Sequence, residues 1–240
     1  MKLDLAVVMP VYNEEACITE VILSWKAVLS QLRARYQLIV LNDGSKDRTA
    51  EKLASLAGDQ HVLVINKPNS GHGPTILQGY HLAVERSEWV FQCDSDNEMR
   101  AKHFPALWAS RDQYDALFGI RFHRVQAPAR KLISSCSRLT VRILFGSGIT
   151  DVNTPYRLIR SSILKQIIAQ ISHDTFAPNV IISGALARAG ARIWNGPVPH
   201  EGRRTGSVSI VRWRLWKAAF KSFWQTLGCR PTIALTPYRD

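Results

Sequence analysis

The first half of the chain alternates between two hydrophobic patterns. Residues 3–11 form a nearly continuous apolar run, which is typical of a strand covered on both faces. From residue 18 to residue 32, apolar side chains recur every three or four positions, which predicts an amphipathic helix. Further strands are predicted at 37–41, 61–65 and 89–92, and further helices at 47–56 and 74–85. This order favours an α/β fold in which right-handed crossovers build a largely parallel sheet.

Each of the first four predicted strands is followed by a cluster of polar residues. The clusters occupy residues 13–15, 42–45, 69–73 and 94–96. The carboxyl ends of parallel strands meet at one edge of a sheet, and ligands of such sheets bind beyond that edge. We therefore expect the four clusters to line one binding site.

The second half is less regular. It predicts strands at 116–121, 156–159 and 192–198, and helices at 129–145 and 176–189. Neither an internal repeat nor a linker interrupts the pattern. We expect one domain over residues 1–209 and an extension over 210–240.

The charge balance favours an anionic partner. The chain has 31 Lys and Arg against 19 Asp and Glu, a formal net charge of +12. Such an excess attracts nucleic acid, an anionic membrane leaflet or phosphorylated small molecules. No recognised nucleic-acid-binding motif is present, so no nucleic-acid partner is predicted. The sequence also predicts neither a secretory signal nor a transmembrane helix.

Three acidic residues follow the fourth predicted strand. In an extended turn alternate side chains point the same way, so Asp94, Asp96 and Glu98 can converge. Neighbouring carboxylates are costly unless a cation neutralises them, and hard oxygen ligands with open positions suit Mg²⁺ or Mn²⁺. The alternative is a solvated acidic turn.

Two other clusters each allow two interpretations. Asp43 lies in a stretch that can form a turn before the next helix, or hold a carboxylate against a base or ribose. Residues 69–74 lead into a helix, so the backbone N–H groups around Gly73 can bind an anion. The stretch is not a dinucleotide fingerprint, because Ile76 occupies the third glycine position. His72 either assists at a phosphate or has no functional role.

Taken together, these motifs resemble those of a known family. Pro10-Val11-Tyr12-Asn13-Glu14-Glu15, Asn42-Asp43-Gly44-Ser45, Asn69-x-Gly71-x-Gly73 and Asp94-x-Asp96 occur in the order found in family 2 glycosyltransferases of GT-A fold. Later stretches, including residues 119–122, 130–134, 151–157 and 200–207, are similar to the polyprenyl-phosphate branch of that family. The resemblance covers about residues 4–225. It implies a GT-A (Rossmann-like) α/β fold, with a mostly parallel sheet flanked by helices and a C-terminal amphipathic helix.

The resemblance also implies roles for individual residues. Donor-binding residues would be Pro10, Tyr12, Glu14, Asp43, Gly73 and Asp94. Asp94, Asp96 and Glu98 would hold the metal and the nucleotide diphosphate. Arg121, Arg130 and Lys131 would receive an acceptor phosphate, and Arg203 would bind the donor pyrophosphate or the leaving group.

The implied reaction is inverting, metal-dependent transfer from a UDP- or GDP-linked sugar to a polyprenyl phosphate or another lipid-linked acceptor. An anionic phosphate oxygen needs no strong base, whereas a hydroxyl acceptor would need one, for which Asp151 is the candidate. The alternatives are transfer to a sugar hydroxyl of a glycan or glycolipid, a nucleic-acid-binding protein, and an inactive membrane scaffold.

The C-terminal segment has a composition suited to a membrane interface. Over residues 209–227 its aromatic and apolar side chains recur at helical spacing, with basic residues on other faces. Such helices lie in the interface between water and lipid, although packing on the domain or on a partner is the alternative. We expect residues 210–227 to contact a membrane surface and the protein to be cytoplasmic, peripheral on the inner face of the membrane.

Overall fold

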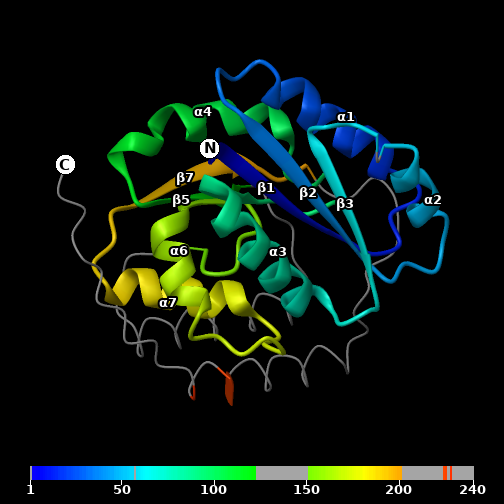
Figure 1. Ribbon diagram of the computed structural model, residues 1–240. Helices are drawn as coiled ribbons and strands as arrows, with labels where there is room; N and C mark the ends of the chain where they lie inside the picture. Colours follow the sequence, from blue (N-terminus) through cyan, green and yellow to red (C-terminus); the bar gives the residue numbers. More distant parts are fainter. Residues whose placement is uncertain (1, 57, 123–150, 202–223, 226–227, 229–240) are drawn as a thin grey trace.

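The computed structural model describes residues 2–56, 58–122, 151–201, 224–225 and 228. In this part of the chain, a seven-stranded sheet has the order β3-β2-β1-β4-β6-β5-β7 (Figure 1). Its strands are β1 (Leu3–Val11), β2 (Tyr36–Asp43), β3 (Val62–Lys67), β4 (Ser87–Gln92), β5 (Ala116–Phe122), β6 (Arg157–Arg160) and β7 (Ile193–Pro199). The helices are α1 (Ile18–Leu29), α2 (Thr49–Ala54), α3 (His72–Arg86), α4 (Phe104–Ser110), α6 (Ser161–Ile168) and α7 (Pro178–Arg188).

Helices cover both faces of the sheet. The helices α1, α2 and α4 lie on one face, and α3, α6 and α7 lie on the other (Figure 1). Strand β1 shows why. Leu5, Val7 and Met9 belong to the core under α1, whereas Ala6 and Val8 belong to the core under α3. Apolar residues at successive positions of one strand therefore produce two hydrophobic layers.

The pairing confirms a mostly parallel sheet and shows one reversal. Strand β1 pairs in parallel with β2 and β4, β2 with β3, and β5 with β7. Strand β6 instead runs antiparallel to β4 and β5. Because of this reversal, the residues just before β6 lie at the edge where the parallel strands end.

The predicted strands all occur within two residues of their expected bounds, and α4 is an element that the sequence pattern did not predict. The predicted helix at 129–145 lies outside the described residues. So does most of the predicted C-terminal extension, residues 210–240, of which Trp224, Gln225 and Gly228 are described, and the domain boundary at 209 stays a prediction. Among the described helices, none has the length and apolar character needed to cross a membrane.

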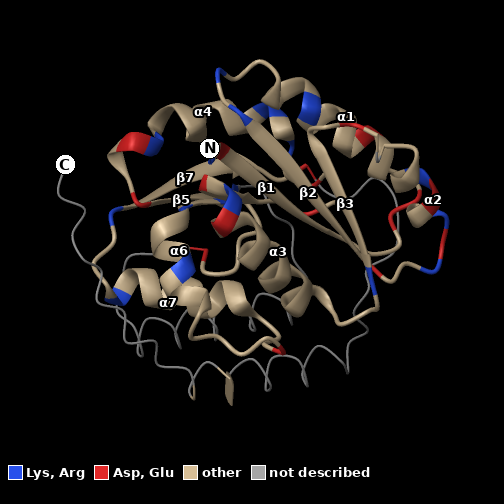
Figure 2. Cartoon of the chain, in the orientation of Figure 1, with Lys and Arg blue, Asp and Glu red and all other residues tan. Residues whose placement is uncertain are grey.

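Charged side chains lie mainly on the helices and loops around the sheet, and the central strands carry few of them (Figure 2). Arg157 at the start of β6 is an exception, because its side chain is fully buried. It belongs to the framework of the candidate site.

Candidate functional site

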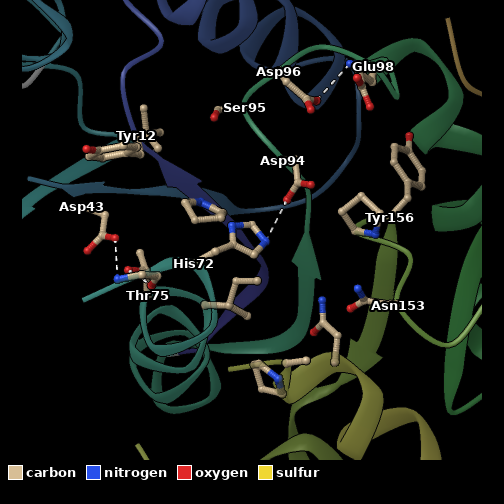
Figure 3. Close-up of a pocket in the computed structure, with 18 of the residues that line it drawn as sticks. Tyr12, Asp43, His72, Thr75, Asp94, Ser95, Asp96, Glu98, Asn153 and Tyr156 are labelled. Carbon is tan, nitrogen blue, oxygen red and sulfur yellow. Dashed lines mark hydrogen bonds and ion pairs between the residues drawn. The ribbon is translucent and has the colours of Figure 1, made fainter. Parts of the chain in front are cut away.

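A cavity of about 660 Å³ opens at the carboxyl edge of the parallel strands (Figure 3). Residues from all four polar clusters line it, as the strand pattern predicted. Its lining includes Pro10, Tyr12, Glu14, Asp43, Asn69, Gly71, His72, Asp94, Asp96, Glu98 and Arg121. Segments before β6 and at the start of α7 complete the wall with Asn153, Tyr156, Phe176 and Asn179.

The first two clusters are hydrogen-bonded to each other. Asn13 has a left-handed backbone (φ 55°), a conformation that asparagine tolerates better than most residues. Its N–H donates to the Ser45 hydroxyl at 3.0 Å, and its side-chain oxygen accepts the N–H of Lys46 at 2.8 Å. These bonds fix the loop that presents Tyr12 and Glu14 to the cavity.

Asp43 joins the second cluster to the third. Its carboxylate is buried, forms an ion pair with Lys67, and accepts the backbone N–H groups of Ser70 at 2.8 Å and Gly71 at 2.9 Å. Gly71 has φ 92°, which a side chain would disfavour. The turn and binding interpretations of this cluster are therefore compatible, because Asp43 orders the loop and lines the cavity.

Ionised Asp43 should stabilise the fold at neutral pH and lose that effect in acid. Burial raises the pKa of Asp43, but Lys67, the Ser70 N–H and the Thr75 hydroxyl outweigh it and lower the pKa below its usual value. A lowered folded-state pKa gives stability that is complete above the unfolded value, about 3.9, and disappears as pH falls through the folded value.

We expect Asp43→Asn to be less stable than the wild type at pH 7 and to lose less stability on acidification. Urea unfolding between pH 7 and pH 3 measures this. The exposed Asp112→Asn should give a profile parallel to that of the wild type, and the same parallel profile for Asp43→Asn would contradict the assignment.

All three residues of the acidic cluster line the cavity. Asp94 and Asp96 follow β4, and the Asp96 carboxylate accepts the Glu98 N–H at 3.2 Å. Glu98 Oε2 lies 2.8 Å from His200 Nε2. Within the described residues, no group of three His, Cys, Asp or Glu side chains is placed to hold a metal ion. Asp94 and Asp96 nevertheless fit a cation that takes one or two carboxylates from the protein and its other oxygens from phosphate and water.

Arg121 and Asp151, predicted from separate motifs, form one ion pair. The guanidinium donates to the two carboxylate oxygens at 2.7 and 2.8 Å. Arg121 lines the cavity from the end of β5, whereas Asp151 lies behind it and is not part of the lining. Arg130, Lys131 and Arg203 lie outside the described residues, so their roles stay predictions.

Arg157 holds the loop before β6 from within the core. Its guanidinium donates to the carbonyl oxygens of Thr154, Asn179 and Val152 at 3.0 to 3.2 Å. Burial lowers the pKa of Arg157. These bonds tie the loop that carries Asn153 to the start of α7, where Asn179 lines the cavity.

Gly73 has a structural role at this site. It does not line the cavity, because the start of α3 packs against the backbone of residues 175–176. A Cβ at Gly73 would lie 2.2 Å from the Phe176 carbonyl oxygen. A side chain here would separate two walls of the cavity.

Several lining residues were not predicted from the sequence as site residues. Phe176 and Asn179 fall at the start of a stretch that reads as a buried helix, and His200 had been noted only as part of a motif. Tyr156 and Asn153 belong to a motif in which only Asp151 had been assigned a role. The Glu98–His200 pair was not visible because it joins residues about a hundred positions apart.

Comparison with known sequences gives consistent matches. The family model described as Glycosyl transferase family 2 matches residues 6–168. An undecaprenyl-phosphate 4-deoxy-4-formamido-L-arabinose transferase of Pseudomonas aeruginosa is 31% identical over 219 residues, and that of Pseudomonas fluorescens is 28% identical. These matches cover 90% of this chain and 62% of each relative. The chain thus spans about three fifths of the length of these relatives.

Solved structures share the fold. Glucosyl-3-phosphoglycerate synthase of Mycobacterium tuberculosis, crystallised with Mn²⁺, UDP and glucosyl-3-phosphoglycerate, superposes with a TM-score of 0.67 at 16% identity, covering 95% of this chain and 80% of that one. Staphylococcal (S. aureus) TarS 1–349, crystallised with UDP-GlcNAc, gives 0.59 at 18% identity, covering 90% and 64%. These likenesses confirm the predicted GT-A fold.

Proposed function

We propose, from the premise that the chain belongs to glycosyl transferase family 2, that it transfers a sugar from a uridine diphosphate sugar to a polyprenyl phosphate with inversion. The observation that carries this proposal is the convergence of Asp43, Asp94 and Asp96 on one cavity at the carboxyl edge of the sheet. The matched relatives, which are undecaprenyl-phosphate 4-deoxy-4-formamido-L-arabinose transferases, support the acceptor. The structural neighbours crystallised with UDP support the donor.

The hydrogen bonds of Asp43 favour uracil over guanine. Its Oδ1 is occupied by Lys67 and the Ser70 N–H, and its Oδ2 accepts the Gly71 N–H. At most one acceptor position therefore remains on Oδ2, since a carboxylate oxygen has two lone pairs. Uracil presents a single N–H between two carbonyl oxygens, whereas guanine presents an N–H and an amino group side by side. A single free position suits the uracil N–H.

Asp94 and Asp96 would hold a divalent cation, Mg²⁺ or Mn²⁺, which would stabilise the departing diphosphate. The Mn²⁺ of the M. tuberculosis structure supports this assignment. Other residues of the cavity would contact the rest of the sugar nucleotide. Pro10, Tyr12 and Glu14 would hold the base and ribose, and residues of the loop before α3 line the same cavity. Glu98, paired with His200, would contribute charge beside the two aspartates.

The Arg121–Asp151 pair favours a phosphate acceptor. Both Asp151 oxygens accept hydrogen bonds from Arg121, so this carboxylate is poorly placed to take a proton from an attacking hydroxyl. A phosphate oxygen is already anionic and needs no such base. Arg121 offers a guanidinium at the cavity wall to bind that phosphate. Arg130, Lys131 and Arg203 would add to this anion site.

The position of the charge along the sequence supports action at an anionic lipid surface. The segments 123–150 and 202–240 contain 13 Lys and Arg and a single acidic residue, Asp240. These two segments therefore carry the whole formal net charge of +12, and the remaining residues have no net charge. Basic segments bind anionic leaflets, with about 1 kcal/mol for each Lys or Arg near the surface. We accordingly propose that residues 210–227 place the enzyme peripherally on the inner, cytoplasmic face of a membrane.

One experiment with two halves tests the function. We expect calorimetry to show UDP binding at least about tenfold more tightly than GDP, because one lost hydrogen bond to a charged group is worth 1.5–3 kcal/mol. Adding Mn²⁺ should strengthen binding relative to EDTA. Equal affinity for UDP and GDP would contradict the role given to Asp43.

The second half supplies labelled UDP-sugars with undecaprenyl phosphate in vesicles of anionic lipid. Label should enter the organic phase as an acid-labile lipid phosphodiester. Transfer to a glycan hydroxyl in place of the lipid phosphate would contradict the proposed acceptor, and no binding of any sugar nucleotide by the folded protein would contradict the proposed enzyme.

A further inference from the structure

A chain of buried side chains runs under the cavity and ends on Asp94. The Tyr80 hydroxyl of α3 donates to Asn179 Oδ1 of α7 at 3.1 Å and lies 3.4 Å from Gln92 Oε1 of β4. Asn179 Nδ2 donates to Gln92 Oε1 of β4 at 2.8 Å, and Gln92 Nε2 donates to Asp94 Oδ1 at 3.1 Å. Tyr80, Asn179 and Gln92 are all at most 3% exposed. Three elements that are far apart in sequence thus meet at one carboxylate.

The chemistry of the groups fixes the direction of every bond in this chain. An ionised Asp94 can only accept, so Gln92 must turn its NH₂ toward it and its oxygen toward Asn179. Asn179 must then present its own NH₂ to Gln92, which leaves its oxygen for Tyr80. Burial raises the pKa of Tyr80, so the hydroxyl keeps its proton and donates it. Every member therefore has a partner, and reversing either amide would place two acceptors together.

We propose that Tyr80, Asn179 and Gln92 are positioning residues that hold Asp94 with Oδ1 occupied and Oδ2 available to a bound cation. The inference rests on the proposed function, in which Asp94 is a metal ligand. His72 Nε2 lies 3.7 Å from the same Oδ1 (Figure 3). Together with the Gln92 amide, two groups therefore converge on one oxygen. The other oxygen has no hydrogen bond to the described residues.

These hydrogen-bonded side chains also join two walls of the cavity. Asn179 lines the cavity, and its carbonyl oxygen accepts a hydrogen bond from Arg157. Tyr80 lies two turns after His72 on α3. Groups that orient metal ligands in this way typically change metal affinity or activity 10- to 100-fold when removed. A fully satisfied buried network is also rigid, so it presets the carboxylate before a cation arrives.

The test is Mn²⁺ affinity, measured by electron paramagnetic resonance with and without UDP. Gln92→Leu should weaken Mn²⁺ binding by roughly 10- to 100-fold. Tyr80→Phe removes the terminal donor alone and should weaken it by a smaller factor, even if Gln92→Leu fails to fold. The matched controls are Val90→Ala, in the same strand but on the apolar core, and Tyr36→Phe, which lies at the start of β2. Both should keep wild-type affinity.

A double variant separates positioning from general damage. If Gln92 acts through Asp94, adding Gln92→Leu to Asp94→Ala should weaken Mn²⁺ binding no further. Additive losses, losses matched by Val90→Ala, or wild-type affinity in Asp94→Ala would each overturn the proposal. UDP binding in EDTA is the separate measure of the proposed function. If UDP still binds but Mn²⁺ affinity is unchanged in the Gln92 and Tyr80 variants, the positioning role is refuted and the proposed function is not.

Discussion

Asp96→Ala is expected to reduce sugar transfer by about 10²- to 10³-fold or more, the loss seen when one charge-stabilising group is removed from an active site. Asp96 lies in the loop after β4 and lines the cavity. Its Oδ1 also accepts the Glu98 N–H, so the loop loses one hydrogen bond. That bond is worth about 1 kcal/mol, too little to unfold the domain.

Steady-state transfer from a UDP-sugar measures the effect, with urea unfolding as the check on folding. The control is Asp112→Ala, which removes an exposed carboxylate that does not line the cavity and should retain full activity. Mn²⁺ titration shows whether the lost activity is lost metal binding. Full activity in a folded Asp96→Ala protein would remove Asp96 from the cation site.

Arg157→Met should lower the free energy of unfolding by about 3–5 kcal/mol, a large share of the 5–15 kcal/mol typical of a domain. The side chain is fully buried, and its guanidinium stacks on Phe118 with 4.7 Å between its central carbon and the ring centroid. Methionine fills much of the volume but donates nothing. The carbonyl oxygens of Val152, Thr154 and Asn179 would each lose a donor inside the core.

Urea unfolding at neutral pH tests this, with Arg192→Met as the matched control. Arg192 is paired with Asp115 at the surface, 59% exposed, and such pairs contribute little. Arg157→Lys keeps the positive charge but lacks the planar set of guanidinium N–H donors. It should therefore lose less stability than Arg157→Met, but more than Arg192→Met. A loss for Arg157→Met as small as that for Arg192→Met would show that water or a rearranged loop satisfies the three carbonyls.

Local patterns predicted the helices and strands of the first half because the hydrophobic periodicity of each one lies within its own residues. The run at residues 3–11 is apolar on both faces, and β1 is buried on both faces. The polar clusters were predicted to meet because parallel strands end at one edge, and the cavity confirms it. The direction of β6 could not be predicted this way. Its four residues carry no periodicity that distinguishes parallel from antiparallel pairing, which depends on the neighbouring strands β4 and β5.

The support beneath the site was not predictable for a similar reason. Gln92 reads as one polar residue at the end of a strand, and Asn179 as one polar residue in a buried helix. Their hydrogen bond joins positions 87 residues apart. Likewise, Arg121 and Asp151 were given separate roles from separate motifs, and the fold pairs them. Motifs identify residues that face a ligand, whereas partners that lie behind them follow from tertiary packing.

The strand order also has a consequence for the folding pathway. Strands β1, β2 and β3 are consecutive in sequence and adjacent in the sheet, so this part can assemble through short loop closures. By contrast, β6 pairs with β4 across a much longer stretch of chain, joining Val90 to Ile159. Long-range pairing of this kind is slow because the chain must lose the entropy of closing a long loop before the stabilising contacts form. The half of the site around Asp43 should therefore form early, and the walls from Asn153 and Asn179 should form only when β6 docks.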